Sequence, residues 1–388
     1  MTLINVGSYP PKQCGIATFS QDLRKSLIKA GHTVSVAAVS DQEYEYHYGA
    51  EVVTQIRQHE KNDYLKAAAQ INNNSAINVV IIQHEYGIYG GPDGSYLLNF
   101  CAALQKPFIV VTHTVLPNPD SGRYKVLVNL TELAAAVVCM TENSAALLQQ
   151  VYQVPSFKLH MISHGVPDFL PKSPQALKRR YHLQNRNIIT TFGLIGPGKG
   201  LELGIRAVAD VLSEYPDCLY LIIGQTHPML QRSQGEKYRQ MLEQLVDKLG
   251  ISENVKFINR FLSDEELGDY LYLTDIYLSP YPNLDQAVSG TLTFAVGTGR
   301  AIVSTPYAHA VELLADNRGL LTSQPDYHQL AQLMKAILSD PELKTRLQNN
   351  ARKLGHTISW TQVGRRYSQV LQQIIDNNFQ EGKPFHYA

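Results

Sequence analysis

The segment FGLIGPGKGLELGIRAV, residues 192–208, sets a glycine-rich turn between two regular elements. The apolar run that leads into it, 188–195, is rich in β-branched residues and predicts a buried strand. The residues that follow, 201–214, repeat their apolar positions at helical spacing. A buried strand, a glycine turn and a helix together form the unit from which parallel α/β sheets are built.

The same alternation extends in both directions along the chain. Further strands are expected in the first half at 3–8, 33–39, 78–84, 108–113, 136–140 and 159–163, and in the second half at 219–224, 255–258, 276–280, 301–304 and 319–322. Helical patterns lie between them, at 17–30, 95–105, 143–152, 235–249, 264–273, 310–315 and 327–338. Two such sets in series predict two doubly wound, Rossmann-like domains with parallel sheets.

The boundary between the two domains is expected in the polar, proline-bearing stretch 168–186. We therefore predict one domain over 1–170 and a second over 171–365. Residues 366–388 continue a helical pattern that either packs on the second domain or crosses back to the first.

The composition excludes several classes of protein. The 388 residues are 44% hydrophobic and 18% charged, which is typical of a globular protein. The 34 basic side chains balance 34 acidic ones, so the chain lacks the basic excess that is typical of nucleic-acid-binding proteins. Four separated cysteines form no metal or disulfide pattern. No apolar run is long enough to cross a bilayer, and the chain opens on a strand-like segment without a signal-peptide core. We expect a cytoplasmic protein without an integral membrane segment, and leave a homo-oligomer open.

Phosphate binding is expected at GLIGPGKG, 193–200. The glycines at 196, 198 and 200 free the backbone amides for an anion, and Lys199 adds one cation. The stretch almost matches the Walker A pattern, but Gly200 stands where a magnesium-binding hydroxyl is needed, which disfavours an ATPase. The alternative for Lys199 is a structural lysine.

Two other loops end at expected helix starts. GSYPPKQCGIATF, 7–19, carries Gly15 just before the first helix, where backbone N–H groups can face a diphosphate. In the long segment 279–314, the amides of Gly290, Thr291 and Leu292 open another helix. An ordinary turn is the alternative in both places.

Histidines follow two strands of the first half. His84 with Glu85, and His113, stand at strand ends, where a histidine can donate to a sugar hydroxyl or exchange a proton. HEYGI, 84–88, lacks the second histidine of a zinc hydrolase motif. Structural histidines remain the alternative.

A metal-bridged diphosphate has no visible ligands, since no Asp-x-Asp sequence occurs. We therefore expect no metal, and expect leaving-group charge to be met by Lys199, backbone amides and Arg260. Arg260 is equally interpretable as a surface ion-pair partner.

Taken in order, these segments resemble the retaining glycosyltransferases of family 4, which have the GT-B fold: two facing Rossmann-like domains with an inter-domain cleft. The resemblance covers nearly the whole chain and is greatest to a bacterial subgroup with segments like PPxQCGIATF, HEYGIYGG, ISHGVPD, FGLIGPGKG and QAVSGTLTFAVGTGRAIVSTP. It implies that Gly15 approaches the donor phosphates, His113 contacts the donor sugar and phosphate, and Lys199 stabilises the leaving diphosphate.

The chain departs from the family at three positions. Leu194 stands where the family usually has an arginine, and Arg260 is a candidate to supply the missing charge. The two acids of the Glu-x7-Glu signature fall on Gln286 and Phe294. Gln286 can still bind a sugar hydroxyl, whereas Phe294 cannot bind ribose as an acid does. Neighbours that can compensate are Asp285, Ser289 and Glu312.

The resemblance implies an enzyme of the EC 2.4 class, a retaining, metal-independent hexosyltransferase without a cofactor. The donor is expected to be GDP-mannose or UDP-glucose, and the acceptor a saccharide or small molecule near His84, Glu85 and Tyr86, with the tyrosine stripe at 44, 46 and 48 beside them. The alternatives are a catalytically altered protein that binds a nucleotide or glycan, and another enzyme of this fold, such as a nucleotide-sugar epimerase or a phosphorylase.

Overall fold

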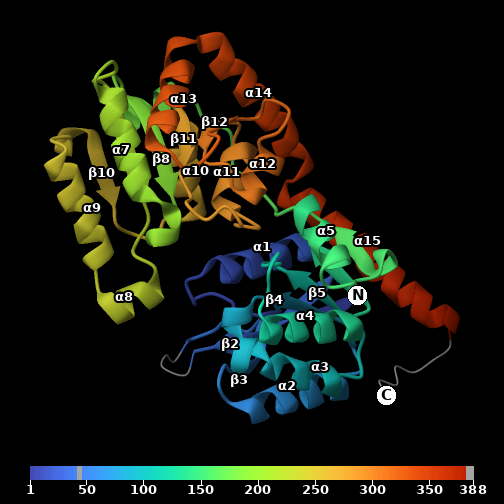
Figure 1. Ribbon diagram of the computed structural model, residues 1–388. Helices are drawn as coiled ribbons and strands as arrows, with labels where there is room; N and C mark the ends of the chain where they lie inside the picture. Colours follow the sequence, from blue (N-terminus) through green and yellow to red (C-terminus); the bar gives the residue numbers. More distant parts are fainter. Residues whose placement is uncertain (42–45, 382–388) are drawn as a thin grey trace. The chain divides into compact units, whose positions relative to one another are not determined.

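The computed structural model describes residues 1–41 and 46–381. The chain forms two compact units (Figure 1). The first unit comprises Met1–Gly165 together with Trp360–Ala388, and the second comprises Val166–Ser359. Tyr44, part of the tyrosine stripe expected near the acceptor, lies outside the described residues.

The first unit is built on a seven-stranded sheet in the order β3-β2-β1-β4-β5-β6-β7, with every pair parallel. Its strands are β1 (Thr2–Gly7), β2 (Thr33–Ser40), β3 (Val52–Arg57), β4 (Ile77–His84), β5 (Phe108–Thr112), β6 (Ala136–Cys139) and β7 (Leu159–Met161). Its helices are α1 (Gly15–Lys29), α2 (Lys61–Asn73), α3 (Tyr96–Ala103), α4 (Ser121–Leu133), α5 (Glu142–Gln150) and α15 (Trp360–Glu381).

Helices cover both faces of this sheet, as buried parallel strands require. Helices α2, α3 and α4 pack on one face, where Tyr64, Phe100 and Leu127 join the strand residues Ile4 and Val6 in one core (Figure 1). Helices α1 and α15 contact each other and strands of the same sheet.

The last helix, whose position the sequence leaves open, packs on the first unit. Ser26 Oγ of α1 donates to the carbonyl of Trp360 at 2.5 Å. A Cβ atom at Gly364 would lie 1.9 Å from the same Ser26 Oγ, so the two helices approach this closely because residue 364 has no side chain.

The second unit holds a six-stranded sheet in the order β10-β9-β8-β11-β12-β13, again wholly parallel. Its strands are β8 (Asn187–Phe192), β9 (Cys218–Ile223), β10 (Val255–Ile258), β11 (Ile276–Ser279), β12 (Ala301–Ser304) and β13 (Leu320–Leu321). Its helices are α6 (Pro174–Arg180), α7 (Leu201–Leu212), α8 (Pro228–Gln234), α9 (Lys237–Lys248), α10 (Asp264–Leu273), α11 (Gly290–Gly297), α12 (Ala308–Leu313), α13 (Tyr327–Ser339) and α14 (Pro341–Thr357).

Two cores enclose this second sheet. Helices α7, α9 and α13 supply Ile205, Leu242 and Leu330 to one of them. Helices α10 and α11 supply Leu271 and Leu292 to the other. The α/β class and the parallel sheets predicted from the sequence are confirmed, and every predicted strand overlaps an observed one.

The strand order determines where a ligand site can form. Chain direction across the sheet reverses between β1 and β4 in the first unit, and between β8 and β11 in the second. In open parallel sheets the crevice outside the carboxyl ends of such neighbouring strands is the usual binding place. In the second unit this brings the loop after β8 beside the loop after β11.

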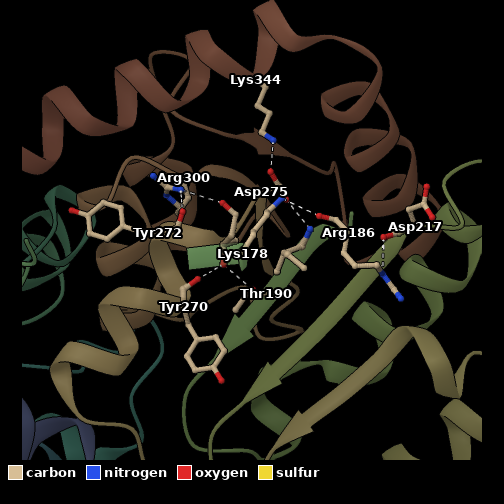
Figure 2. Close-up of polar contacts among 11 residues, drawn as sticks. Lys178, Arg186, Thr190, Asp217, Tyr270, Tyr272, Asp275, Arg300 and Lys344 are labelled. Carbon is tan, nitrogen blue, oxygen red and sulfur yellow. Dashed lines mark hydrogen bonds and ion pairs between the residues drawn. The ribbon is translucent and has the colours of Figure 1, made fainter. Parts of the chain in front are cut away.

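At the amino ends of its strands, the second sheet carries a half-buried ion cluster (Figure 2). Asp275, at the start of β11, accepts from Lys178 of α6 at 2.5 Å and from Lys344 of α14 at 2.7 Å. Burial alone would raise the pKa of Asp275, but the two ammonium groups hold it below its ordinary value. The cluster joins α6 and α14 to the amino end of β11, whereas the crevice lies at the carboxyl ends of the strands.

Candidate functional site

The loop after β8 has the glycine-dependent backbone that its sequence suggests. Gly200 has φ 59°, and a Cβ atom there would lie 2.1 Å from the carbonyl oxygen of Pro280. Only glycine permits this approach between the loops that follow β8 and β11. At Gly198 a Cβ atom would meet nothing within 4 Å, and at Gly196 only Leu230 at 3.8 Å. The backbone at these two positions is open to a ligand.

Lys199 lies in this loop and points to the neighbouring one. Its Nζ atom donates to the Oη atom of Tyr281 at 2.5 Å and lies 4.4 Å from the centre of that ring. Tyr281 follows β11 and is 2% exposed. Burial alone would raise the pKa of Tyr281, but the Lys199 charge and hydrogen bonds lower it overall.

The amino end of α11 lies in the same network. Ser289 caps the helix, since its Oγ atom accepts from the backbone N–H of Leu292 at 3.3 Å. Thr291 Oγ1 lies 2.8 Å from Tyr281 Oη, and Ser289 N donates to His309 Nδ1 at 2.8 Å. The Leu292 amide is therefore already engaged, and Gly290 and Thr291 supply the remaining backbone donors of this helix end.

The residues aligned with the missing acids have other partners. The Gln286 amide group donates to the carbonyl of Val288 at 2.8 Å. Phe294 is buried in the core of the second unit, where its ring stacks on Phe192 at 6.0 Å. Glu312 lies on α12, and its carbonyl accepts from Arg318 at 3.1 Å.

Arg260 forms a surface ion pair. Its guanidinium donates to both carboxylate oxygens of Glu266 at 2.7 and 3.0 Å, and its side chain is 51% exposed. Hydrogen bonding to Arg260 lowers the pKa of Glu266 to about 2. This is the alternative that the sequence offered for Arg260, and it leaves the guanidinium less available to a phosphate.

In the first unit, Gly15 is the first residue of α1. The preceding residue, Cys14, caps the helix through its Sγ atom, which accepts from Ala17 N at 3.3 Å. A Cβ atom at Gly15 would meet nothing within 4 Å. The loop after β1 thus presents open backbone at a helix amino end, as the sequence predicts.

Three histidines, His84, His113 and His164, lie near the carboxyl edge of the first sheet. His84 and His113 are buried, with 1% and 9% of their surface exposed, and His164 is half-buried. His113 Nε2 lies 2.9 Å from Gln83 Oε1. Burial lowers the pKa values of all three rings: to about 4 for His84, about 3 for His113 and about 4 for His164. All three rings are neutral at pH 7.

Glu85 and Tyr86 lie on the loop that follows His84. The Glu85 carboxylate accepts from Thr114 Oγ1 at 2.6 Å and from Tyr86 N at 3.0 Å, and burial raises the pKa of Glu85. Tyr86 Oη donates to the carbonyl of Arg123 at 3.4 Å. Tyr46 donates to Asp41 at 3.2 Å.

Two residues that contact the candidate site residues, Tyr281 and Gln83, were not indicated by the sequence. A signal for Tyr281 exists in hindsight, because SPYP, 279–282, follows directly on a strand that lies beside β8. Gln83 is 0% exposed inside β4, and a buried amide needs polar partners.

Among residues 1–41 and 46–381, no cluster of three or more His, Cys, Asp or Glu side chains is arranged to hold a metal ion. In the same part of the chain, no helix combines the length and apolarity needed to span a bilayer.

Two family descriptions match the chain in succession. Residues 14–168 match "Glycosyltransferase Family 4", and residues 175–354 match "Glycosyl transferases group 1". Solved structures agree on the fold. The Anabaena HepE protein in complex with UDP has TM-score 0.76 at 16% identity, covering 96% of this chain and all of that one. Sucrose-phosphate synthase from Thermosynechococcus elongatus has TM-score 0.78 at 16% identity, covering 97% and 100%. The chain is thus a GT-B protein with two glycosyltransferase domains in series.

Curated relatives are glycosyltransferases as well. The alpha-D-kanosaminyltransferase of Streptomyces kanamyceticus is 26% identical over 229 residues, which is 57% of this chain and 55% of the relative. A GDP-mannose-dependent phosphatidylinositol monomannoside mannosyltransferase of Mycolicibacterium smegmatis is 25% identical over 199 residues, 48% and 49% of the two chains. The chain therefore spans about half the length of these relatives, which are glycosyltransferases by name.

Proposed function

We propose that this chain is a retaining hexosyltransferase that moves mannose or glucose from a nucleotide-diphosphate sugar to a saccharide or small-molecule acceptor, without a metal ion. The observation that carries the proposal is the meeting of two loops in the second unit. Lys199 from the loop after β8 and the open end of α11 after β11 converge on one crevice of the sheet. A cation and free helix amides are what a diphosphate needs.

The donor roles follow from this arrangement. The diphosphate binds Lys199 and the backbone of Gly196, Gly198 and Gly200, and the amides of Gly290 and Thr291 complete its surroundings. Gln286, Ser289 and Glu312 lie on the same side of the sheet and are proposed for the sugar and nucleoside. The similar Anabaena protein binds UDP and UDP-glucose, and the Mycolicibacterium smegmatis relative is GDP-mannose-dependent, so both donors are candidates.

The acceptor is proposed to bind on the first unit. Glu85 and Tyr86, on the loop after β4, are proposed to contact it, whereas Gly15, which opens the helix after β1, is proposed to approach the donor phosphates. The Glu85 carboxylate is held by Thr114, so it is oriented to receive a hydroxyl. His84 is buried under this loop, and we propose that it supports the ring of Tyr86, whose centre lies 4.8 Å away. His113 is proposed to contact the donor sugar.

The reaction then needs positioning more than a pair of catalytic carboxylates. The bond between the anomeric carbon and the phosphate oxygen breaks while the acceptor oxygen bonds to the same face of the sugar. The acceptor proton passes to the departing phosphate oxygen. The protein holds the two reactants together and stabilises the charge that develops on the diphosphate.

One observation favours a second function, a nucleotide or glycan binding module. Phe294 occupies a core position where an acid of the resembled family would hold the ribose. Such a module would retain the diphosphate crevice and lose transfer.

The test is a panel of nucleotide sugars, scored by thermal shift and by donor hydrolysis, with a set of saccharide and inositol acceptors. Hydrolysis or transfer of a hexose, with retained anomeric configuration seen by NMR, supports the proposal. Stabilisation by the nucleotide alone, without turnover of any donor, selects the binding module. No response to any nucleotide or nucleotide sugar would reject both functions.

A further inference from the structure

Lys199 has an unusual partner for a half-buried cation. Its Nζ atom contacts the phenol oxygen of Tyr281 at 2.5 Å. Across residues 1–41 and 46–381, no carboxylate forms an ion pair with Lys199. The nearby His227 does not compete with Lys199 as a cation, because burial and the Lys199 charge both lower the pKa of His227.

The phenol oxygen of Tyr281 has its hydrogen-bonding capacity filled. It accepts from Lys199 Nζ at 2.5 Å and from Ser289 Oγ at 3.4 Å, and it lies 2.8 Å from Thr291 Oγ1, to which it can donate. The ring is fixed as well, since it stacks on Tyr307 with centres 5.0 Å apart and planes 14° from parallel. Tyr281 is therefore a rigid anchor.

The backbone beside the lysine is shaped to let it reach this anchor. Gly193 has φ +132°, and a Cβ atom there would lie 3.4 Å from both Cε and Nζ of Lys199. The side chain thus passes directly over the glycine on its way from the loop after β8 to the loop after β11.

We propose that Tyr281 is the positioning residue for Lys199: its hydroxyl group holds the ammonium in one fixed direction at the crevice, where a nucleoside diphosphate requires a positive charge. A carboxylate in this place would neutralise the lysine, and an apolar residue would leave it without a fixed direction. The phenol occupies one of three ammonium donors, so two remain for phosphate oxygens. The diphosphate ligand in this inference rests on the proposed function, whereas the contact between Lys199 and Tyr281 does not depend on it.

The loss of the contact is tested with Tyr281→Phe, which keeps the ring and its stack on Tyr307. Calorimetry with UDP and with GDP is run on wild type, Tyr281→Phe, Lys199→Met and the double variant. We expect Tyr281→Phe to weaken diphosphate binding about 10-fold or more, the range for a hydrogen bond to a charged group. In the Lys199→Met background the same change should cost less than about 2-fold.

The matched control is Tyr220→Phe. Tyr220 is likewise a buried tyrosine of the second unit, and its Oη atom bonds Thr191 Oγ1 at 2.8 Å. Removal of this hydroxyl reports the general cost of losing such a bond. An equal loss of affinity in Tyr281→Phe and Tyr220→Phe, or an equal cost of Tyr281→Phe with and without Lys199, overturns the proposal.

A second measurement needs no ligand and separates this proposal from the proposed function. The ammonium group of Lys199, observed by ¹⁵N NMR, should exchange its protons slowly in wild type and fast in Tyr281→Phe. If wild type binds neither diphosphate but the slow ammonium signal is lost in Tyr281→Phe, the proposed function fails and the positioning role stands. An unchanged ammonium signal in Tyr281→Phe refutes the positioning role, whatever the protein binds.

Discussion

The Nε2 atom of His113 lies 2.9 Å from the Oε1 atom of Gln83, whose own amide nitrogen donates to Asn5 Oδ1 at 2.8 Å. Because the amide nitrogen of Gln83 is committed to Asn5, its oxygen faces the histidine. His113 Nε2 must then carry the proton, and Nδ1 keeps a free lone pair in the neutral ring. The strand β4 thus sets both the orientation and the tautomer of a histidine at the end of β5.

Replacing Gln83 with glutamate should favour the imidazolium form of His113. A carboxylate at bonding distance in a buried place favours the charged ring, so we expect the pKa of His113 to rise by more than about 2 units from its value of about 3. Two-dimensional NMR of the His113 ring nitrogens as a function of pH measures this pKa. Gln83→Leu is the control, in which the pKa should stay low and the tautomers mix. A His113 pKa unchanged in Gln83→Glu would mean that the two side chains are not in contact.

Lys199→Ala should lower turnover by at least about 100-fold, the range for losing one donor that stabilises charge in the transition state. The effect should fall on kcat more than on KM for the acceptor, because the diphosphate charge develops as the donor bond breaks. Steady-state kinetics with the donor identified by the panel give both parameters.

Arg260→Ala provides the comparison on the same unit. Its guanidinium is half exposed and paired with Glu266, so we expect a change in kcat below about 3-fold and little change in stability. A near-normal rate in Lys199→Ala would remove this lysine from the site, and a large loss in Arg260→Ala would assign the leaving-group charge to Arg260.

The sequence predicts the sheets well, because long apolar runs and glycine turns are local signals. It does not indicate β3 (Val52–Arg57), which lies at a sheet edge and has Ile56 as its one fully buried residue. Nor does it reveal that Tyr281 meets Lys199, since this depends on β8 and β11 being neighbours although they lie far apart in the chain. Residue types predict the chemistry available, whereas the contacts between them follow from strand order.

The first unit should lose stability as the pH falls from about 6.5 toward 4. The folded-state pKa values of His84, His113 and His164 lie at about 4, 3 and 4, below the 6.5 expected in the unfolded chain. The unfolded state therefore binds up to three more protons in this window, and the free energy of unfolding should fall by about 4 kcal/mol per pH unit at the steepest point. Glu85, whose pKa burial raises, opposes this trend.

Urea unfolding followed by the fluorescence of Trp360, at pH 7.0, 6.0 and 5.0, measures this slope. Trp360 belongs to the first unit and lies 5.8 Å from the His164 ring, so it reports on the right region. His164→Phe should reduce the slope by about 1.4 kcal/mol per pH unit, the contribution of one proton. A slope that is flat in wild type would show that these histidines are not held neutral.

Arg300 should be required for the stability of the second unit (Figure 2). It is 4% exposed, and its guanidinium donates to the carbonyls of Tyr272 at 2.9 Å, Thr274 at 3.1 Å and Thr298 at 2.8 Å. These carbonyls end α10 and α11, where helix oxygens have no partner of their own. Burial and the nearby Arg352 lower the pKa of Arg300 to about 10, so it still donates as a cation at pH 7.

Arg300→Met keeps most of the side-chain volume and leaves these carbonyls without donors, so we expect a loss of roughly 3 kcal/mol in the free energy of unfolding. Arg300→Lys should recover part of it, since one ammonium reaches fewer of the oxygens than the planar guanidinium. Arg206→Met, on the exposed side of α7, is the control and should change stability by less than about 0.5 kcal/mol. Because α11 carries Ser289 and Thr291 at its other end, Arg300→Met should also weaken UDP or GDP binding. Full stability in Arg300→Met would mean that water replaces the guanidinium at both helix ends without loss.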